Sequence, residues 1–314
     1  MNILVRGAFY RQFERRLKKA APNARFIPFE DRAEMLELLP KADALYGGSP
    51  REDMLDRCAK LRWIHMRSAG VDRYFPQELA KRGIALTNGS GAYDIPIAEH
   101  VFAMALALTR RIHLYIRNQI EKRWERGETP ADLYGKNLGI YGMGSIGTRV
   151  AQIGAAFGMK AYGVARRGRS KPDFAEALWT PDRLDELLGM SDLFVVCLPL
   201  TNATRNCIGA REFGLMKSTA LFFNIGRGAT VNAPALTRAL TEGQIAGAGL
   251  DVTNPEPLPV ESPLWNMPNV VLTPHVSGSS AVSAARGEEI AIENIRRFAA
   301  GEPLLNVVDP QHGY

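Results

Sequence analysis

Four residues that can bind a ligand or move a proton stand at the ends of apolar segments in the second half of the chain. They are Arg227 in FFNIGRGA, Asp251 in GAGLDV, Glu256 in NPEP and His275 in TPHVSG. An imidazole titrates near neutral pH and serves as acid or base, and a guanidinium binds carboxylates and polarises carbonyl oxygens. This set suits hydride transfer coupled to proton transfer, as in the reduction of a 2-oxo acid.

Each of the four residues has a predicted role in that chemistry. His275 is the acid/base group, and Glu256 fixes its tautomer by hydrogen bonding the far ring nitrogen. Arg227 binds the substrate carboxylate and the carbonyl oxygen. Asp251 is predicted to orient the carboxamide of a nicotinamide. Loops at the carboxyl ends of parallel strands carry ligand sites, so we expect these side chains to converge there.

A glycine-rich turn supplies the second functional pattern. YGMGSIG follows a strand-like run, opens a helix-like run, and places Gly142, Gly144 and Gly147 in the G-x-G-x-x-G spacing. The glycines allow a tight turn, close approach of a pyrophosphate and close helix packing, while the helix N-terminus attracts phosphates. The predicted dinucleotide-binding turn therefore consists of Gly142, Met143, Gly144, Ser145, Ile146 and Gly147.

The segment YGVARRGR bears on which dinucleotide binds. At this distance after the glycines, an Asp or Glu would accept hydrogen bonds from the adenine ribose hydroxyls. The sequence has Ala165 there, followed by Arg166 and Arg167, with Arg169 and Ser170 close behind. Guanidinium groups suit a 2′-phosphate, which a carboxylate would repel. We therefore predict that NADP(H) is preferred over NAD(H).

Composition excludes several other classes of protein. The 314 residues favour two domains, and 46% hydrophobic with 23% charged residues is ordinary for a globular protein. The net charge of +6 is modest, and the basic run 15–19 reads as a solvated helix face, so no nucleic-acid partner is predicted. The three cysteines lack metal-ligand spacing, so we expect a cytoplasmic protein with no metal. The apolar runs are too short to span a membrane.

The order of apolar and polar runs predicts the fold class. The first hundred residues alternate strand-like and helix-like segments, which favours a parallel sheet covered by helices. From about Pro96 a long helical pattern follows, and the polar segment 124–136 reads as a connecting arm. A second and more regular α/β run then begins at Asn137, and a last helix begins near Ser283.

In combination these motifs resemble the D-isomer-specific 2-hydroxyacid dehydrogenase family. The resemblance is carried by GMGSIG, CLPLTNATRNCIG, FFNIGRGATVN, GAGLDVTNPEPLP and NVVLTPHVSG, in this order and spacing. It extends from SAGVD, residues 68–72, to FAAGEPLLNVVD near the carboxyl terminus. The missing acid at Ala165 matches the NADPH-preferring glyoxylate/hydroxypyruvate reductase branch.

The resemblance implies two similar doubly wound α/β domains with parallel sheets, the active site lying in the cleft between them. A Rossmann-type dinucleotide-binding domain, residues 98–285, is inserted into a flavodoxin-like substrate domain, residues 1–97 and 286–314. Backbone N–H groups of Ala69 and Gly70 bind the substrate carboxylate, beside Arg227 and His275. Family members are usually dimers joined through the nucleotide domains, so the helix and arm around Trp124 are the expected contact. The resemblance also adds cofactor contacts from Leu198, Pro199, Thr204, Ile225, Gly226, Asp251 and His275.

The sequence thus predicts an NADPH-dependent reductase of small 2-oxo acids to D-2-hydroxy acids, of the glyoxylate or hydroxypyruvate type. A phosphite-oxidising enzyme on the same scaffold is an alternative that these residues leave open. A formate-oxidising relative is disfavoured, since that branch has Gln where Glu256 stands. A dinucleotide-sensing protein like the family's transcriptional corepressors is a third alternative, because those proteins keep the same charged residues.

Overall fold

The computed structural model describes residues 1–50, 52–72, 74–166 and 170–313. It divides into two compact units, unit 1 formed by Met1–Tyr93 with Ser280–Tyr314, and unit 2 formed by Asp94–Ser279. The chain leaves unit 1 where one helix begins and returns where another begins, whereas the sequence placed these boundaries at 97/98 and 285/286. Arg167 and Arg169 of the predicted phosphate site lie outside the described residues.

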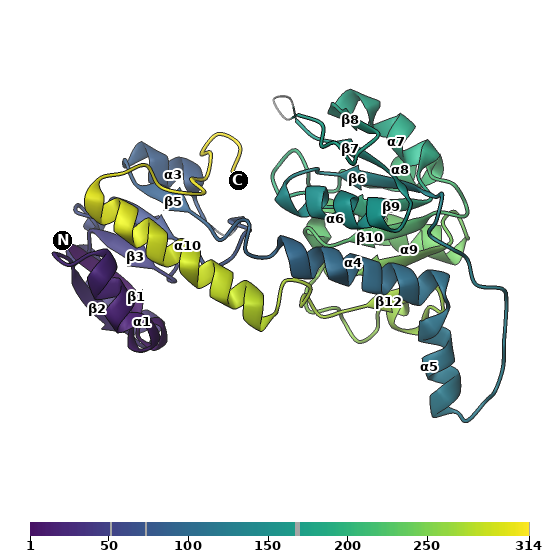
Figure 1. The fold of residues 1–314 in the computed structure, drawn as a ribbon, viewed down its shortest axis with the longest axis horizontal. Helices are drawn as coiled ribbons and strands as arrows, with labels where there is room; N and C mark the ends of the chain where they lie inside the picture. The colour runs from purple at the N-terminus through teal and green to yellow at the C-terminus, as the bar shows by residue number, and fades with distance from the viewer. Residues whose placement is uncertain (51, 73, 167–169, 314) are drawn as a thin grey trace. The chain divides into compact units, whose positions relative to one another are not determined.

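Unit 1 is built on a parallel sheet of five strands among the described residues, in the order β2-β1-β3-β4-β5. Helices cover both faces of this sheet (Figure 1). Its strands and α-helices are β1 (Asn2–Arg6), α1 (Gly7–Ala20), β2 (Arg25–Phe29), α2 (Arg32–Leu38), β3 (Ala44–Tyr46), β4 (Trp63–His65), α3 (Pro76–Lys81), β5 (Ala85–Thr87) and α10 (Ala281–Ala300).

The two faces of this sheet follow from the alternation of side chains along each strand. In β1, Ile3 and Val5 point toward α1 and α10, where Ile295 is also fully buried. Leu4 points to the opposite face, into a cluster with Met35 of α2. The predicted alternation of strands and helices is therefore confirmed, and α10 completes unit 1 from the far end of the chain.

Unit 2 contains a parallel sheet of seven strands among the described residues, in the order β12-β11-β10-β9-β6-β7-β8. Its strands and α-helices are α4 (Asp94–Thr109), α5 (Ile112–Ile120), β6 (Asn137–Tyr141), α6 (Ser145–Ala156), β7 (Lys160–Val164), β8 (Ala177–Trp179), α7 (Leu184–Met190), β9 (Leu193–Val196), α8 (Ala210–Leu215), β10 (Leu221–Asn224), α9 (Ala233–Thr241), β11 (Gly247–Leu250) and β12 (Val270–Leu272).

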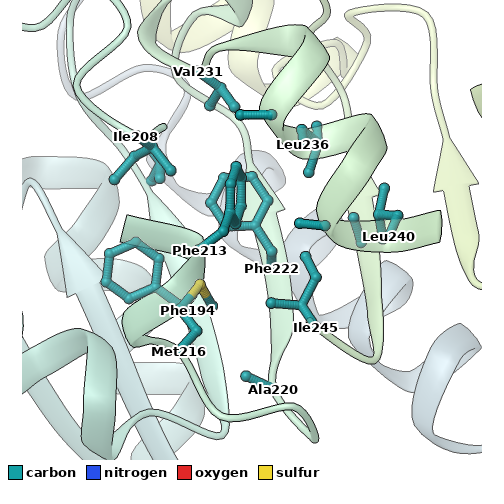
Figure 2. Packing of buried hydrophobic residues seen from close by; sticks show 14 of the residues in the cluster. Phe194, Ile208, Phe213, Met216, Ala220, Phe222, Val231, Leu236, Leu240 and Ile245 are labelled. Carbon is teal, nitrogen blue, oxygen red and sulfur yellow. The ribbon is translucent and has the colours of Figure 1, made fainter. Parts of the chain in front are cut away.

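Aromatic side chains fill the core between this sheet and helices α8 and α9 (Figure 2). Phe222 of β10 meets Phe213 of α8 edge to face, with ring centroids 5.3 Å apart, and both rings are fully buried. The next residue, Phe223, is also fully buried and points to the opposite face of the sheet, where it neighbours Met104 of α4. Burial on both faces explains the nearly continuous apolar run of this strand.

The long helix predicted from Pro96 is divided into α4 and α5, so that prediction is wrong in one respect. Arg111 has a φ of 58°, the left-handed conformation, which ends a right-handed helix. The ring nitrogens of His113 then contact the carbonyl oxygens of Ala107, at 2.7 Å, and Pro268, at 2.9 Å, which holds α5 at an angle to α4. No helix in the described ranges is both long and apolar enough to cross a membrane.

Candidate active site

The glycine-rich turn joins β6 to α6 at the carboxyl edge of the unit 2 sheet. Gly142 has a φ of 101°, and a Cβ atom there would lie 2.9 Å from the carbonyl oxygen of Cys197. Gly147 admits no Cβ either, because it faces the carbonyl of Gly142. Gly144 is the N-cap of α6, and the first turn of that helix contains no acidic residue. Backbone N–H groups at this helix start can therefore meet a phosphate.

This turn lies where the strand order reverses. The chain runs from β6 outward to β8 on one side of the sheet, and then from β9 outward to β12 on the other. In open parallel sheets the crevice at such a reversal holds the ligand. Gly142 follows β6, and Leu198 follows β9, with 3.1 Å between a Cβ at Gly142 and the side chain of Leu198. The residues at this crevice fit a dinucleotide.

The predicted ribose position lies at the end of the neighbouring strand β7. Ala165 follows that strand directly, and its N–H donates to the carbonyl of Trp179 at 2.9 Å. Arg166 is exposed beside it. The side chain of Met143 is buried, so this residue of the turn offers a ligand only its backbone.

Loop 198–204 after β9 is stabilised by its own side chains. The hydroxyl of Thr204 donates to the carbonyl of Pro199 at 2.7 Å and accepts the N–H of Thr201 at 2.8 Å. Thr204 therefore closes the loop that presents Pro199 at the carboxyl edge. Its assignment as a direct cofactor contact stays a prediction, as do those of Ile225 and Gly226, which follow β10.

The backbone of Arg227 is fixed by buried polar groups. Its carbonyl oxygen accepts hydrogen bonds from the Thr230 hydroxyl at 2.7 Å, the Thr230 N–H at 3.1 Å and the Asn224 side-chain amide at 3.1 Å. Both Asn224 and Thr230 are buried. The guanidinium is partly buried, and its Nη1 donates to the carbonyl of Gly226 at 2.9 Å. Arg227 thus stands on a rigid turn at the end of β10.

The structure brings Glu256 and His275 together from separate loops. Nδ1 of His275 lies 3.0 Å from Oε1 and 3.1 Å from Oε2 of Glu256. The imidazole side chain is 45% exposed and the carboxylate side chain 37% exposed, so both can reach a ligand. With Nδ1 held by the carboxylate, Nε2 is the ring nitrogen left for proton exchange.

The turn that carries His275 is strained and is held by Asp251. His275 has a φ of 54°, a conformation that non-glycine residues adopt at a cost. The buried Asp251 carboxylate accepts the N–H groups of Val276, at 2.9 Å, and Ser277, at 3.0 Å, and the hydroxyl of Thr273, at 2.7 Å. The His275 N–H also donates to the Asp251 carbonyl at 2.8 Å.

These bonds also set the charge of Asp251. Burial alone would raise its pKa, but the hydrogen bonds from Ser277, Thr273 and the backbone N–H groups outweigh burial and hold the pKa below its usual value. The carboxylate is therefore an anion, and its hydrogen bonds stabilise the turn formed by residues 273–277. The predicted contact of Asp251 with a nicotinamide carboxamide stays a prediction.

Sequence reasoning missed two members of this network. Nε2 of His100, on α4, lies 2.9 Å from the Thr273 hydroxyl and 3.8 Å from Oδ1 of Asp251. His100 sits among apolar residues in IAEHVFAMAL, and Thr273 directly follows a strand, so neither pattern indicated a role. The signal that could have marked His100 is a polar side chain directly before the apolar run VFAMALAL, residues 101–108.

The predicted substrate loop lies in unit 1, after β4. The Asn88 side-chain amide donates to the carbonyl of Ala69 at 2.7 Å, and the Ser68 hydroxyl donates to the carbonyl of Gly70 at 2.8 Å. The Tyr93 hydroxyl donates to the carbonyl of Arg67. These bonds occupy carbonyl oxygens of the loop.

Comparison with known proteins identifies the fold and the family. Residues 102–277 match the family model of the D-isomer specific 2-hydroxyacid dehydrogenase NAD binding domain. The chain is 38% identical over 288 residues to a glyoxylate reductase of Aeropyrum pernix, covering 88% of this chain and 85% of that protein. The chain belongs to the D-isomer specific 2-hydroxyacid dehydrogenase family. The resemblance drawn from the motifs is therefore confirmed.

Solved structures of this family match nearly the full length of the chain. A family member from Aeromonas salmonicida is 33% identical, with a TM-score of 0.84 and coverage of 98% of this chain and 99% of that one. A glyoxylate/hydroxypyruvate reductase from Sinorhizobium meliloti, in complex with NADP and sulfate, is 29% identical, with a TM-score of 0.82 and coverage of 100% and 99%. The predicted fold, an α/β chain with two parallel-sheet domains, is confirmed, and the chain is an oxidoreductase that binds a nicotinamide dinucleotide.

Proposed function

We propose that this chain is an NADPH-dependent reductase of small 2-oxo acids to D-2-hydroxy acids, of the glyoxylate or hydroxypyruvate type. The observation that carries the proposal is the His275–Glu256 pair, with Nδ1 3.0 Å from the carboxylate, at the same sheet edge as the glycine-rich turn. The names of the similar Aeropyrum and Sinorhizobium proteins support this substrate class.

The cofactor preference rests on the end of β7. Ala165 presents no carboxylate where the ribose hydroxyls would lie, and Arg166 is exposed next to it. A guanidinium favours a 2′-phosphate over a hydroxyl. The turn 142–147 and the start of α6 hold the pyrophosphate, and the nicotinamide supplies a hydride when bound.

The residues of this chain supply the rest of the chemistry. Arg227 binds the substrate carboxylate and polarises the carbonyl oxygen, which stabilises the negative charge that develops there. The protonated His275 donates from Nε2 to that oxygen, and Glu256 stabilises the imidazolium through Nδ1–H. We extend the proposal to Ala69 and Gly70, whose N–H groups bind the substrate carboxylate.

A steady-state assay in the reductive direction tests this function. Purified protein is expected to oxidise NADPH with glyoxylate or hydroxypyruvate, to form the D-hydroxy acid where the product is chiral, and to use NADH more weakly. His275→Ala should lower kcat by at least about 100-fold, the range of general acid–base catalysis, and His312→Ala is the matched control. Reduction of NADP⁺ by phosphite, without turnover of any 2-oxo acid, would overturn the proposal.

We further propose that the chain forms a homodimer through α5 and the arm that follows it. Ile116 and Ile120 lie four residues apart on α5, at 51% and 77% exposed, and Trp124 is 98% exposed. None of the α5 residues is buried against the rest of its own chain. An apolar stripe of this kind on a helix usually marks a protein–protein interface.

Light scattering coupled to size-exclusion chromatography measures this association. The wild-type mass is expected to be twice that of the chain, and Ile116→Asp should shift it to the monomer. Val260→Asp, at an exposed position elsewhere in unit 2, is the control that keeps the dimer. A monomeric wild-type protein at micromolar concentration would contradict the proposal.

A further inference from the structure

Two arginines of unit 1 lie against one glycine at the carboxyl edge of its sheet. Arg6 ends β1 and Arg67 follows β4, and β3 pairs with both strands in parallel. Gly47 lies directly after β3, and both side chains pass close to it. A Cβ at Gly47 would lie 3.1 Å from Cγ of Arg6 and 3.7 Å from Cδ of Arg67. The two side chains are therefore neighbours at the edge where parallel sheets bind ligands.

Among the residues that the structure describes, no ion pair neutralises the positive charge of Arg6 or Arg67. On nearby elements Arg11 is paired with Glu30, and Arg16 with Glu289. Within the described ranges of the chain, neither Arg6 nor Arg67 is in an ion pair with an acidic side chain. Exposed arginines without a partner on a ligand-binding edge are available to an anion.

The surroundings of Tyr46 place both charges in the same small region. Tyr46 is the last residue of β3 and is buried. Burial raises the pKa of its hydroxyl, while the positive charges of Arg67 and Arg6 act in the opposite direction. Glu288 of α10 also acts on Tyr46 and raises its pKa, but it is in no ion pair with either arginine in the described part of the chain.

Arg67 also stands next to the predicted substrate loop in the sequence. It immediately precedes Ser68, Ala69 and Gly70, and its carbonyl oxygen accepts the Tyr93 hydroxyl. The carbonyl of Ala69 is held by Asn88 at 2.7 Å. The Arg67 side chain therefore starts from a loop segment that hydrogen bonds hold in place, which lowers the entropic cost of binding an anion beside it.

We propose that Arg6 and Arg67 form a second anion subsite, which selects 2-oxo acids carrying another carboxylate or a phosphate at the end remote from the oxo group. This inference rests on the proposed function, because it names the substrate class of the same site. A guanidinium pair matches two or more oxygen atoms of such a group, whereas glyoxylate has no group to fill the subsite.

Matched substrate pairs test the inference and distinguish the two anions. The carboxylate arm compares 2-oxoglutarate with 2-oxopentanoate, and the phosphate arm compares phosphohydroxypyruvate with hydroxypyruvate. In at least one arm, the wild-type kcat/KM should be about tenfold or more higher for the charged member, the size of one charge-assisted hydrogen bond. Arg67→Gln and Arg6→Gln should each lower that ratio about tenfold, chiefly through KM. Arg15→Gln, an exposed arginine elsewhere on unit 1, should leave the ratio unchanged.

Two results would overturn the subsite. One is equal kcat/KM for the charged and uncharged members in both arms, and the other is a ratio that neither variant changes. If no 2-oxo acid is reduced, the proposed function fails, and calorimetric titration with 2-oxoglutarate and phosphohydroxypyruvate then decides the subsite. Binding that weakens about tenfold in Arg67→Gln supports it, whereas absent or unchanged binding contradicts it.

Discussion

Both carboxylate oxygens of Glu256 lie close to Nδ1 of His275, at 3.0 and 3.1 Å. The pair joins the loop after β11 to the loop after β12, and the hydrogen bond determines which ring nitrogen faces a ligand. A carboxylate in this position also stabilises the imidazolium that gives up the proton.

Replacing Glu256 with Gln should therefore lower kcat/KM for glyoxylate by about 10- to 100-fold, because the amide keeps an acceptor but loses the charge. Initial rates with NADPH measure the effect. Glu261→Gln, an exposed carboxylate in the same segment, is the matched control and should retain wild-type rates. Full activity of the Glu256 variant would remove this residue from the acid/base pair.

Asp251 is expected to act by positioning His275. Asp251→Asn keeps one acceptor oxygen but places an amide donor opposite the N–H group of either Val276 or Ser277, so charge-assisted hydrogen bonding worth about 2 kcal/mol or more is lost. We expect kcat to fall at least tenfold while the Kd for NADPH, measured by fluorescence titration, changes less. Thr273→Val should cause a smaller loss of the same kind. A raised Kd with unchanged kcat would instead favour the carboxamide role.

Substitutions of Ala165 and Arg166, which follow β7, are expected to change the cofactor preference. Ala165→Asp introduces the carboxylate that accepts ribose hydroxyls and repels a 2′-phosphate, so the ratio of kcat/KM for NADPH to that for NADH should fall at least about tenfold. Arg166→Gln should lower the same ratio. Arg238→Gln, an exposed arginine on α9, is the control for loss of one positive charge. If the ratio of kcat/KM for NADPH to that for NADH is unchanged in both variants, the residues at the end of β7 do not determine the cofactor preference.

His65 makes the stability of unit 1 depend on pH. Its ring is fully buried against the Thr87 hydroxyl, 2.7 Å from Nδ1, and burial lowers the pKa of His65 to about 4. Below the ordinary histidine pKa of about 6.5 the unfolded chain takes up a proton here that the folded chain does not. The free energy of unfolding should therefore decrease by about 2 kcal/mol between pH 7 and pH 5 from this group.

Denaturant unfolding at the two pH values measures that change, with His65→Gln expected to reduce the difference. The variant is less stable at both pH values if it leaves a buried polar group unpaired. Only the change in its free energy of unfolding between pH 7 and pH 5 tests the titration of His65. Equal differences for wild type and variant would assign the pH dependence to other groups.

Local patterns in the sequence were sufficient for the fold class and for the residues at the strand ends. Alternating strand and helix periods, a glycine-rich turn between a strand and a helix, and charged residues after apolar strands are all short-range signals. They placed Gly142, Arg227, Glu256 and His275 on loops, and the structure finds them at one edge of a parallel sheet. Parallel topology makes this convergence predictable, since every strand ends at the same edge.

The tertiary structure decided what lies between elements that are distant in sequence. The break between α4 and α5 depends on a single left-handed residue, Arg111, and on contacts of His113 with Pro268, which no helical periodicity reveals. The Asp251–Thr273–His100 network joins two strands and a helix through buried hydrogen bonds. The sequence contains Asp251 and His100 but does not show that they are neighbours. Only the packing of the folded chain determines that the Asp251 carboxylate stabilises the turn that carries His275. Hydrogen bonds depend on distances of a few tenths of an ångström, and these follow from the folded chain and not from local propensity.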